Sequence, residues 1–377
     1  MKKILMYCLL LLIVFGLIGY LLRRNITSLF FIPRQKTVTN ELTSHATPPT
    51  SKDIETIAQN LDIPWEIAFL PNGGLLVTER SGKLLKIKPE SKTIAEIGGV
   101  KHIGEGGLLG LAIHPNFSAN NFIYIYLTTQ DSRGISNRVE RYKLLNDTVI
   151  EKEIVLEGIR GSSNHNGGRI AFGPDGHLYI TTGDSENPDL AQDKNSLNGK
   201  ILRVTDDGSV PADNPFGNPV YSLGHRNPQG LTWDQNGTLW ETEHGPSGAQ
   251  TGYDEVNIIV KGANYGWPII KGDQLRDGYV SPVIQSGGDD TWAPGGITYW
   301  NGSLFFVGLR GEALYQAKIE QGNKLNVTTH LQGTYGRLRT ITLGNDGYFY
   351  LVTSNTDGRG RENQGDDILI KIDPKSL

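Results

Sequence analysis

Apolar and polar residues alternate along this chain in short runs that come in pairs. A turn rich in Pro, Asn, Asp and Gly separates the two runs of each pair. Asn-Gly or Asp-Gly between alternating runs predicts a β-hairpin, because both central turn residues are expected to need positive φ angles. Five such copies pair residues 67–69 with 75–77, 170–172 with 178–180, 231–233 with 239–240, 297–299 with 304–307, and 341–343 with 349–352. A sixth copy, with a longer turn, pairs residues 111–113 with 122–126.

The spacing of these hairpins indicates a repeat architecture. Each copy occupies about 54 residues of the segment 52–377, which is enough for a four-stranded propeller blade and a loop. The predicted fold is therefore all-β, a six-bladed β-propeller. A β-sandwich is the alternative, but a sandwich has no reason to repeat one hairpin at this spacing. Residues 54–60 and 367–372, at the two ends of the domain, are expected to complete the same blade.

The N-terminus carries an apolar segment of a different kind. Residues 4–22 are nineteen positions without a charge, flanked by pairs of basic residues. A helix of this length just spans a bilayer core of ~30 Å, and no small-residue cleavage site follows it. We expect residues 1–24 to be an uncleaved signal anchor that holds the protein on the periplasmic or extracellular side of the inner membrane, with a cleaved signal peptide as the alternative. Residues 25–52 read as a flexible linker, and residues 53–377 as the propeller domain.

Composition excludes several classes of function. The 36 Lys and Arg residues are nearly balanced by 40 Asp and Glu residues, and both signs are scattered. A nucleic-acid partner is therefore not expected. The single cysteine, Cys8, excludes an internal disulfide and a multi-cysteine metal site. The 47 glycines fit a fold with many tight turns.

Polar residues cluster just before the first strand and just after the second strand of the predicted hairpins. These positions share one end of a hairpin, because its two strands are antiparallel. They hold Glu105, His165, Arg226, Trp292 and Arg337 before the first strand, and Asp184, residues 243–246 and Arg310 after the second. We expect these side chains to converge on one mouth of the propeller channel.

Within this group, His165 and Asp184 flank the same hairpin and are expected to be neighbours. A carboxylate beside an imidazole holds one tautomer and stabilises the protonated ring, which suits a general base. A structural histidine and a solvated loop are the alternatives.

Arginine side chains and backbone oxygen atoms indicate what could bind at this mouth of the channel. Arg226, Arg310, Arg337 and Arg339 would attract a small molecule with several carboxylates or phosphates. The backbone at residues 245–246, near the acidic pair 254–255, offers the oxygen ligands that calcium prefers.

Several motifs then resemble a known family. The similarity runs from about residue 64 to about residue 373, in order and with similar spacing, and the family is that of the soluble quinoprotein glucose dehydrogenases, with the bacterial aldose sugar dehydrogenases as the nearest branch. The motifs are GEGGLLGLA at 104–112, SNHNGGRI at 163–170, TGD at 182–184, LGHRNPQGL at 223–231, EHGP at 243–246 and NYGWP at 264–268.

The resemblance implies a six-bladed propeller that binds pyrroloquinoline quinone (PQQ) and calcium and oxidises the anomeric carbon of aldose sugars to lactones. It implies that His165 is the general base and that Asp184 orients it. Positions matching the cofactor-binding residues are Glu105, Arg226, Asn227, Arg310, Arg337 and Arg339. The carbonyls of Gly245 and Pro246 match the ligands of the cofactor's calcium, and Glu255 with the Tyr265 backbone matches a second, structural calcium site.

The sequence departs from the family pattern at two positions. Glu105 stands where the family commonly has glutamine, and Thr340 stands where it often has aspartate. A carboxylate beside an anionic quinone must be protonated, paired with an arginine or turned away, because two like charges within about 4 Å repel by on the order of 1 to 4 kcal/mol.

Two other functions stay open at this point. A calcium-dependent lactonase would also place carboxylates and a histidine at the channel mouth, but it would not need four arginines there. A non-enzymatic binding propeller would be expected to have lost His165 or the arginines. The dehydrogenase interpretation further implies an aldose substrate and an external electron acceptor, a quinone or a cytochrome, and it leaves open whether the protein forms a homodimer.

Overall fold

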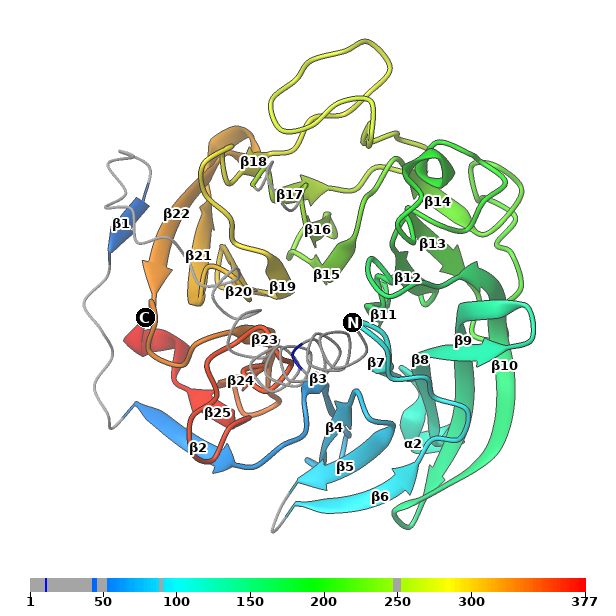
Figure 1. The fold of residues 1–377 in the computed structure, drawn as a ribbon, viewed down its shortest axis with the longest axis vertical. Coiled ribbons are helices and arrows are strands. Elements are labelled where there is room, and N and C mark those ends of the chain that lie inside the picture. The colour runs from blue at the N-terminus through cyan, green and yellow to red at the C-terminus, as the bar shows by residue number, and fades with distance from the viewer. Residues whose placement is uncertain (1–10, 12–42, 46–52, 88–90, 247–251) are drawn as a thin grey trace, which may run out of the picture.

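A computed structural model describes residues 11, 43–45, 53–87, 91–246 and 252–377, which form six β-sheets around a central channel (Figure 1). The prediction of a six-bladed propeller is confirmed, and the β-sandwich alternative is wrong. Among the described residues, no helix combines the length and the apolar character needed to cross a membrane. The predicted anchor at residues 4–22 lies outside the described part of the chain, apart from Leu11.

Each sheet is a blade, numbered here in chain order. Blade 1 is β3 (Pro64–Phe69), β4 (Leu75–Glu79), β5 (Lys83–Ile87) and β6 (Lys92–Glu96). Blade 2 is β7 (Leu108–Ile113), β8 (Phe122–Asp131), β9 (Gly134–Leu145) and β10 (Thr148–Arg160). Blade 3 is β11 (Ile170–Phe172), β12 (Leu178–Thr182), β13 (Lys200–Val204) and β14 (Val220–Leu223).

The other three blades follow the same plan. Blade 4 is β15 (Pro228–Trp233), β16 (Leu239–Glu243), β17 (Glu255–Ile258) and β18 (Ile284–Gln285). Blade 5 is β19 (Pro294–Trp300), β20 (Ser303–Gly308), β21 (Ala313–Ile319) and β22 (Leu325–His330). Blade 6 is β23 (Leu338–Leu343), β24 (Phe349–Thr353), β25 (Leu369–Ile372) and β2 (Ile54–Ala58). The described helices are short: α2 (Phe117–Asn120), η1 (Pro188–Ala191), η3 (Gln321–Asn323) and η4 (Pro374–Ser376).

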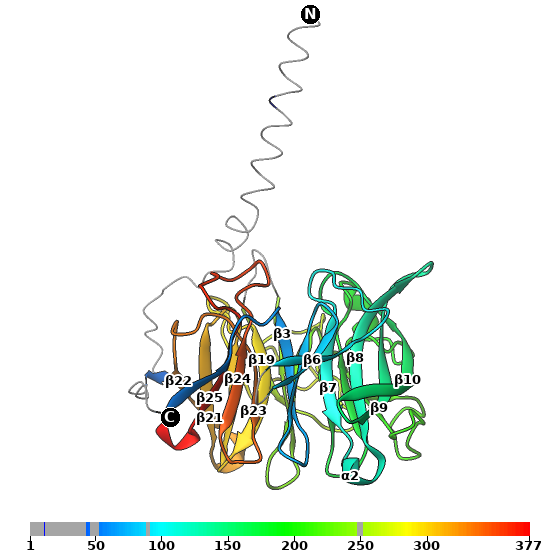
Figure 2. The same ribbon diagram turned by 90° about the horizontal axis from the view of Figure 1, so that it is seen from below.

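The six predicted hairpins are the two inner strands of the six blades. The innermost strands, β3, β7, β11, β15, β19 and β23, contact one another in sequence around the channel. The contact between β23 and β3, the last and the first of these strands, closes the ring. Viewed from the side, the strands run along the channel axis, and the turn that carries α2 lies at one end of the molecule (Figure 2).

The two ends of the domain close the ring within a single blade. Strand β2 pairs antiparallel with β25, with Ile54 opposite Ile372, as expected from the sequence. Strand β1 (Thr43–His45), within the segment interpreted as a linker, pairs in parallel with β22 at the outer edge of blade 5. The rest of residues 25–52 lies outside the described residues.

The hairpin turns differ in one respect from the expectation. Only the glycine has a positive φ in four of the five Asn-Gly or Asp-Gly turns, whereas Asn301 and Gly302 both do in the fifth. In the first turn, Gly73 donates its N–H to the carbonyl of Leu70, and Leu70 donates its N–H to the carbonyl of Gly74. Each of these short turns is therefore a tight bend that needs a left-handed glycine, which is why glycine recurs in the five copies with a short turn.

Apolar side chains fill the space between neighbouring blades. Because both faces of each sheet are covered, strands such as β4 bury every residue rather than alternate ones. Phe305 of blade 5 and Phe349 of blade 6, for example, meet at a ring-centroid distance of 4.7 Å. This interblade core holds the loops at the channel mouth in place.

Candidate active site

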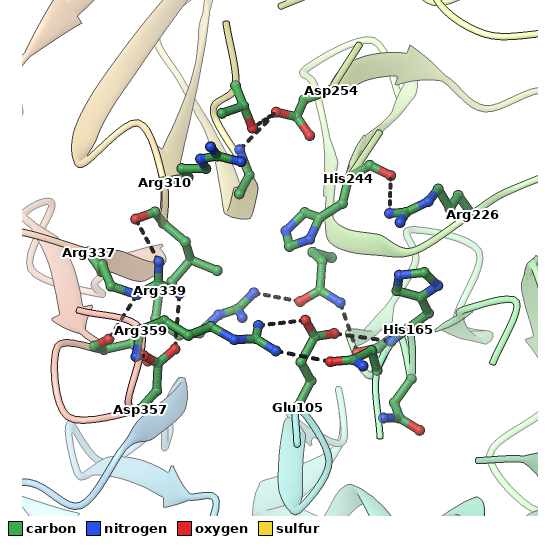
Figure 3. A pocket seen from close by; sticks show the side chains of 18 of the residues that line it. Glu105, His165, Arg226, His244, Asp254, Arg310, Arg337, Arg339, Asp357 and Arg359 are labelled. Atoms are coloured by element: carbon green, nitrogen blue, oxygen red, sulfur yellow. Dashed lines mark hydrogen bonds and ion pairs between the residues drawn. The ribbon is translucent and has the colours of Figure 1, made fainter. Parts of the chain in front are cut away.

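A cavity of about 530 Å³ opens at the end of the channel opposite the hairpin turns. All six blades line it, mostly through the segments that precede an inner strand or follow the second strand, and also through the first residues of β3, β15 and β23. Its volume lies in the range of small-molecule sites, about 300–1,000 Å³. Figure 3 shows the charged side chains converging on this space from opposite walls.

The structure brings most of the sequence-predicted site residues together in this cavity. Its lining includes Glu105, His165, Arg226, Gly245, Pro246, Arg310, Arg337 and Arg339. Asp184 and Asn227 are fully buried directly behind it. Trp292 does not line the cavity and instead packs on Phe306 and Tyr315 in the core of blade 5. Glu255 and Tyr265 belong to a separate cluster, described below.

His165 is held by Asp184 of blade 3, which is itself held by a residue of blade 4. Its Nδ1 lies 2.8 Å from Oδ1 of Asp184, whose other oxygen accepts a hydrogen bond of 2.8 Å from the indole of Trp267. The His165 side chain is 17% exposed, whereas that of Asp184 is 1% exposed. His165 adopts a φ of +56°, uncommon for a residue with a side chain. The imidazole therefore faces the cavity with its Nδ1 engaged by a buried carboxylate.

Two glycines that follow His165 allow this arrangement. Gly167 has a φ of +64°, and a Cβ atom there would lie 2.6 Å from the carbonyl oxygen of Thr181. Only glycine fits so close to strand β12. The tight packing explains why the imidazole and Asp184, from opposite sides of one hairpin, meet at its open end.

Positive charge predominates in the cavity lining. Six arginines line it, at positions 80, 226, 310, 337, 339 and 359, against four carboxylates at positions 105, 186, 254 and 357. Burial lowers the pKa of Arg80 to about 10 and that of Arg339 to about 9. Glu105 and Asp357 offset this effect of burial only in part, so the excess of arginines over carboxylates favours an anionic ligand.

Polar atoms without a protein partner also point to a ligand. Nδ2 of Asn227, Nε2 of His244 and Nε of Arg339 are buried and form no hydrogen bond within the protein. Burial lowers the pKa of His244 to about 3, so its imidazole is neutral at physiological pH. An orphaned buried donor costs about 1–3 kcal/mol, which a bound polar ligand would relieve.

Glu105 is ionised and paired. Its Oε1 accepts a hydrogen bond of 2.7 Å from Nη1 of Arg359, and its Oε2 accepts one of 3.0 Å from the backbone N–H of His165. Burial raises the pKa of Glu105, but Arg359 and His165 lower it by more, so that the net pKa lies well below its usual value. Of the three arrangements open to Glu105, the structure has the arginine pair. Thr340, the other departure from the family pattern, directs its hydroxyl to Glu66 at 3.4 Å.

The backbone at Gly245 and Pro246 is held by a buried carboxylate. Oδ1 of Asp254 accepts a hydrogen bond of 2.9 Å from the Gly245 N–H, and Oδ2 accepts bonds from Trp292 and Ala293. A Cβ atom at residue 245 would lie 2.2 Å from the Gly252 carbonyl oxygen, so this position requires glycine. Asp254 thus fixes the segment whose carbonyls are candidates for binding a cation.

Glu255 lies in a second, buried cluster of acidic groups. Ligand atoms of His225, Glu241 and Glu243 lie within 4.8 Å of one another, and Asn257 contacts the carboxylates of Glu241, Glu243 and Glu255. Burial, together with Glu243, raises the pKa values of Glu241 and Glu255. Tyr265 joins this cluster through its ring, which stacks on His225 at 4.6 Å. Oε1 of Glu241 and Oδ1 of Asn257 have no hydrogen-bond partner within the protein, so a cation would fit there.

Several cavity residues were missed by the sequence analysis. They include Trp65, Arg80, Asn164, Gln229, Asp357 and Arg359. Arg80 directly follows β4, and Asp357 and Arg359 follow β24. The same positional rule that selected Asp184 and Arg310, applied to blades 1 and 6, would have found these three. His244 belongs to the segment 243–246 that was expected at the mouth, and it does line the cavity, but nothing in the sequence shows that its Nε2 is buried without a hydrogen-bond partner.

Comparisons with known proteins agree with this geometry. Residues 61–369 match the glucose/sorbosone dehydrogenase family. The aldose sugar dehydrogenase YliI of Escherichia coli is 30% identical over 363 residues, covering 87% of this chain and 94% of that protein. Among solved structures, a PQQ-bound aldose sugar dehydrogenase from Streptomyces coelicolor is 40% identical, covers 86% of this chain and 99% of its own, and superposes with a TM-score of 0.79. A putative glucose dehydrogenase from Thermus thermophilus is 44% identical, with 85% and 99% coverage and a TM-score of 0.80.

Proposed function

This chain belongs to the glucose/sorbosone dehydrogenase family, and on that premise we propose that it is a PQQ- and calcium-dependent aldose sugar dehydrogenase that oxidises the anomeric carbon of its substrate to a lactone. The observation that carries the proposal is one cavity that combines an excess of buried arginines with a histidine oriented by a buried carboxylate. Two relatives support it: the PQQ-bound aldose sugar dehydrogenase of Streptomyces coelicolor and the aldose sugar dehydrogenase YliI of Escherichia coli.

The cavity fits PQQ on chemical grounds. The cofactor is a planar polycarboxylate, and the depressed pKa values of Arg80 and Arg339 indicate that the cavity is short of negative charge. Arg226, Arg310, Arg337 and Arg339 would hold its carboxylates, and the orphaned Nδ2 of Asn227 would donate to one of its oxygens. When bound, PQQ supplies the two-electron acceptor for the hydrogen that leaves the sugar C1 as hydride.

The residues of the chain would carry the proton. His165 would accept the proton of the C1 hydroxyl at Nε2, because its Nδ1 is engaged by Asp184. Asp184 would keep the ring in one tautomer and stabilise the imidazolium that forms, and Trp267 would hold Asp184 in place. The sugar loses one proton and one hydride, and the C1–O bond becomes the carbonyl of the lactone.

Calcium would bind in two places. The carbonyls of Gly245 and Pro246, which line the cavity, would hold the ion that accompanies the cofactor. Glu255, among the buried carboxylates of Glu241 and Glu243, would hold a structural ion together with the Tyr265 backbone. Closely spaced buried carboxylates repel one another, and a divalent cation relieves that cost.

The other two functions fit the cavity less well. A lactonase has no use for six arginines around the reaction site. A non-enzymatic binding propeller has no use for a histidine fixed by an aspartate and a tryptophan.

The direct test is a titration of the purified protein with PQQ in the presence of calcium, followed by absorbance. A stoichiometric shift of the quinone spectrum, with aldose-dependent reduction of an artificial electron acceptor, supports the proposal. No quinone binding at micromolar concentrations of both components contradicts it.

The cellular setting is part of the proposal. The uncharged run at residues 4–22 supports an anchor that places the enzyme on the periplasmic or extracellular side of the membrane. An external quinone or cytochrome would then reoxidise the cofactor.

A further inference from the structure

One ion pair crosses the cavity and contacts the candidate base. Arg359 donates from Nη1 to Oε1 of Glu105 at 2.7 Å and from Nη2 to Oδ1 of Asn164 at 2.9 Å. The second oxygen of Glu105 accepts the backbone N–H of His165 at 3.0 Å. Figure 3 shows the guanidinium of Arg359 pointing toward Glu105, which lies beside His165.

The pair joins three blades. Arg359 lies between β24 and β25 of blade 6, Glu105 precedes β7 of blade 2, and His165 precedes β11 of blade 3. The side chains of Arg359 and Glu105 are 25% and 24% exposed, and both residues line the cavity. Salt screens a partly buried ion pair less than a fully exposed one, so this pair keeps more of its strength than a surface pair would.

We propose that Arg359 is the counter-ion of Glu105 and that the two form a positioning pair: Arg359 cancels the charge of a carboxylate that would otherwise face the anionic quinone, and Glu105 fixes the backbone of His165. The inference rests on the proposed function only for the identity of the ligand. The pair, the cavity and the bond to His165 are properties of the chain itself.

Two features of the site support a role through Glu105. First, Arg337, on the same blade as Arg359, is paired in the same way with Asp357 at 2.9 Å. Both carboxylates are thus neutralised, while Arg80 and Arg339 have depressed pKa values. Second, His165 has a positive φ of 56°, a conformation that persists only where neighbouring contacts maintain it.

The test is a double-mutant cycle on quinone affinity, measured by absorbance titration with calcium. Arg359→Gln leaves an unpaired carboxylate beside the anion, so we expect affinity to fall at least tenfold. Glu105→Gln alone should bind at least as tightly as the wild type, because it removes a negative charge and leaves the guanidinium of Arg359 to face the anion. The double variant Glu105→Gln/Arg359→Gln should return to within about threefold of the wild type, because it removes both charges.

Two controls separate the pair from general charge effects. Arg361→Gln removes the same charge from the same loop but from an exposed residue that does not line the cavity, and it should change affinity by less than about twofold. Arg359→Lys keeps the charge but cannot reproduce both hydrogen bonds of the guanidinium, so its affinity should lie between that of the wild type and that of Arg359→Gln. A double variant that binds as weakly as Arg359→Gln, or an Arg359→Gln variant that binds like the wild type, would overturn the proposal.

A second readout does not require the quinone. Amide hydrogen exchange in the peptide that contains His165 should accelerate at least tenfold in Glu105→Ala and should also accelerate in Arg359→Gln, but not in Arg361→Gln. Unchanged exchange in both cavity variants would overturn the positioning role. If the wild-type protein fails to bind PQQ, the proposed function fails, whereas the exchange experiment still decides whether the pair positions His165.

Discussion

Nδ1 of His165 lies 2.8 Å from Oδ1 of Asp184, and the indole of Trp267 donates to Oδ2 of the same aspartate at 2.8 Å. The carboxylate is therefore held on both sides, once by the ring that it orients and once by a tryptophan from another loop. The assignment of His165 as the base depends on this relationship, because an imidazole with a fixed tautomer presents the same nitrogen to every substrate molecule.

Replacing His165 should separate chemistry from binding. His165→Ala and His165→Gln are expected to keep PQQ affinity within about threefold and to lose turnover by two to four orders of magnitude, the range of a general base. Stopped-flow reduction of the quinone-loaded protein by an aldose that the wild type oxidises measures this. His177→Ala is the matched control, because His177 also lies near an aspartate, 3.3 Å from Asp175, but does not line the cavity. Turnover within about threefold of the wild type in both His165 variants would show that the base lies elsewhere.

Changes at Asp184 should affect the rate more than the affinity. Asp184→Asn removes the charge that stabilises the imidazolium, so kcat should fall at least tenfold while KM and PQQ affinity change little. Trp267→Phe removes the donor to Oδ2 and should cause a smaller fall in kcat. Trp233→Phe serves as the control, since Trp233 packs on Tyr179 away from the cavity. A rise in KM without a change in kcat would assign Asp184 to substrate binding instead.

Removal of the metal should abolish activity and lower the thermal stability of the protein. Exhaustive chelation is expected to release PQQ and to lower the melting temperature, because the carboxylates at positions 241, 243 and 255 then repel one another. Added Ca²⁺ should restore both properties, and Mg²⁺ should not, because its smaller shell does not fit flexible carbonyl and carboxylate ligands. Glu255→Gln should reduce the calcium-dependent part of the melting temperature. Full activity after chelation and dialysis would remove calcium from the mechanism.

Lys200 gives a prediction for pH dependence. Its Nζ is buried and donates to the carbonyls of Leu190, Ala191 and Asn198 at 2.6–3.0 Å, and burial lowers its pKa from 10.5 to about 7. The unfolded chain therefore binds a proton at higher pH than the folded chain does, so stability is lost as the pH falls from about 10 towards 7. The wild type and Lys200→Met can be compared by urea denaturation. The unfolding free energy of the wild type minus that of Lys200→Met should be more positive at pH 9.5 than at pH 7. An equal difference at both pH values would show that the three carbonyls keep the ammonium fully charged.

The location of the protein can be tested by fractionation. The intact chain should sediment with membranes, and a chain that starts at Ser51 should be soluble and active, because it lacks the uncharged run at residues 4–22. Washing with high salt should not release the intact form. Recovery of a soluble exported form that begins between residues 20 and 50 would mean that the segment is a cleaved signal.

Local signals in the sequence were sufficient for the architecture. A glycine that must adopt a positive φ recurs between alternating runs, so the hairpins, their number and the positions of the inner strands could be predicted. Closure by residues 54–58 and 369–372 followed from the presence of strand patterns at both ends of the domain. The positions flanking each hairpin then predicted which residues face the cavity, because antiparallel strands place both flanks at one end.

The tertiary structure alone decided which charges meet. Arg359 and Glu105 are 254 residues apart, and only the closed ring of blades brings them within 2.7 Å. The sequence shows a glutamate beside an expected anion site but not the arginine that neutralises it, since loop conformation and side-chain rotamer set that contact. The same holds for Glu241 and Glu243, which read as alternate residues of a strand and turn out to share a buried cluster with His225. Backbone conformation is encoded by neighbouring residues, whereas electrostatic pairing in a low-dielectric interior depends on distances that the sequence does not contain.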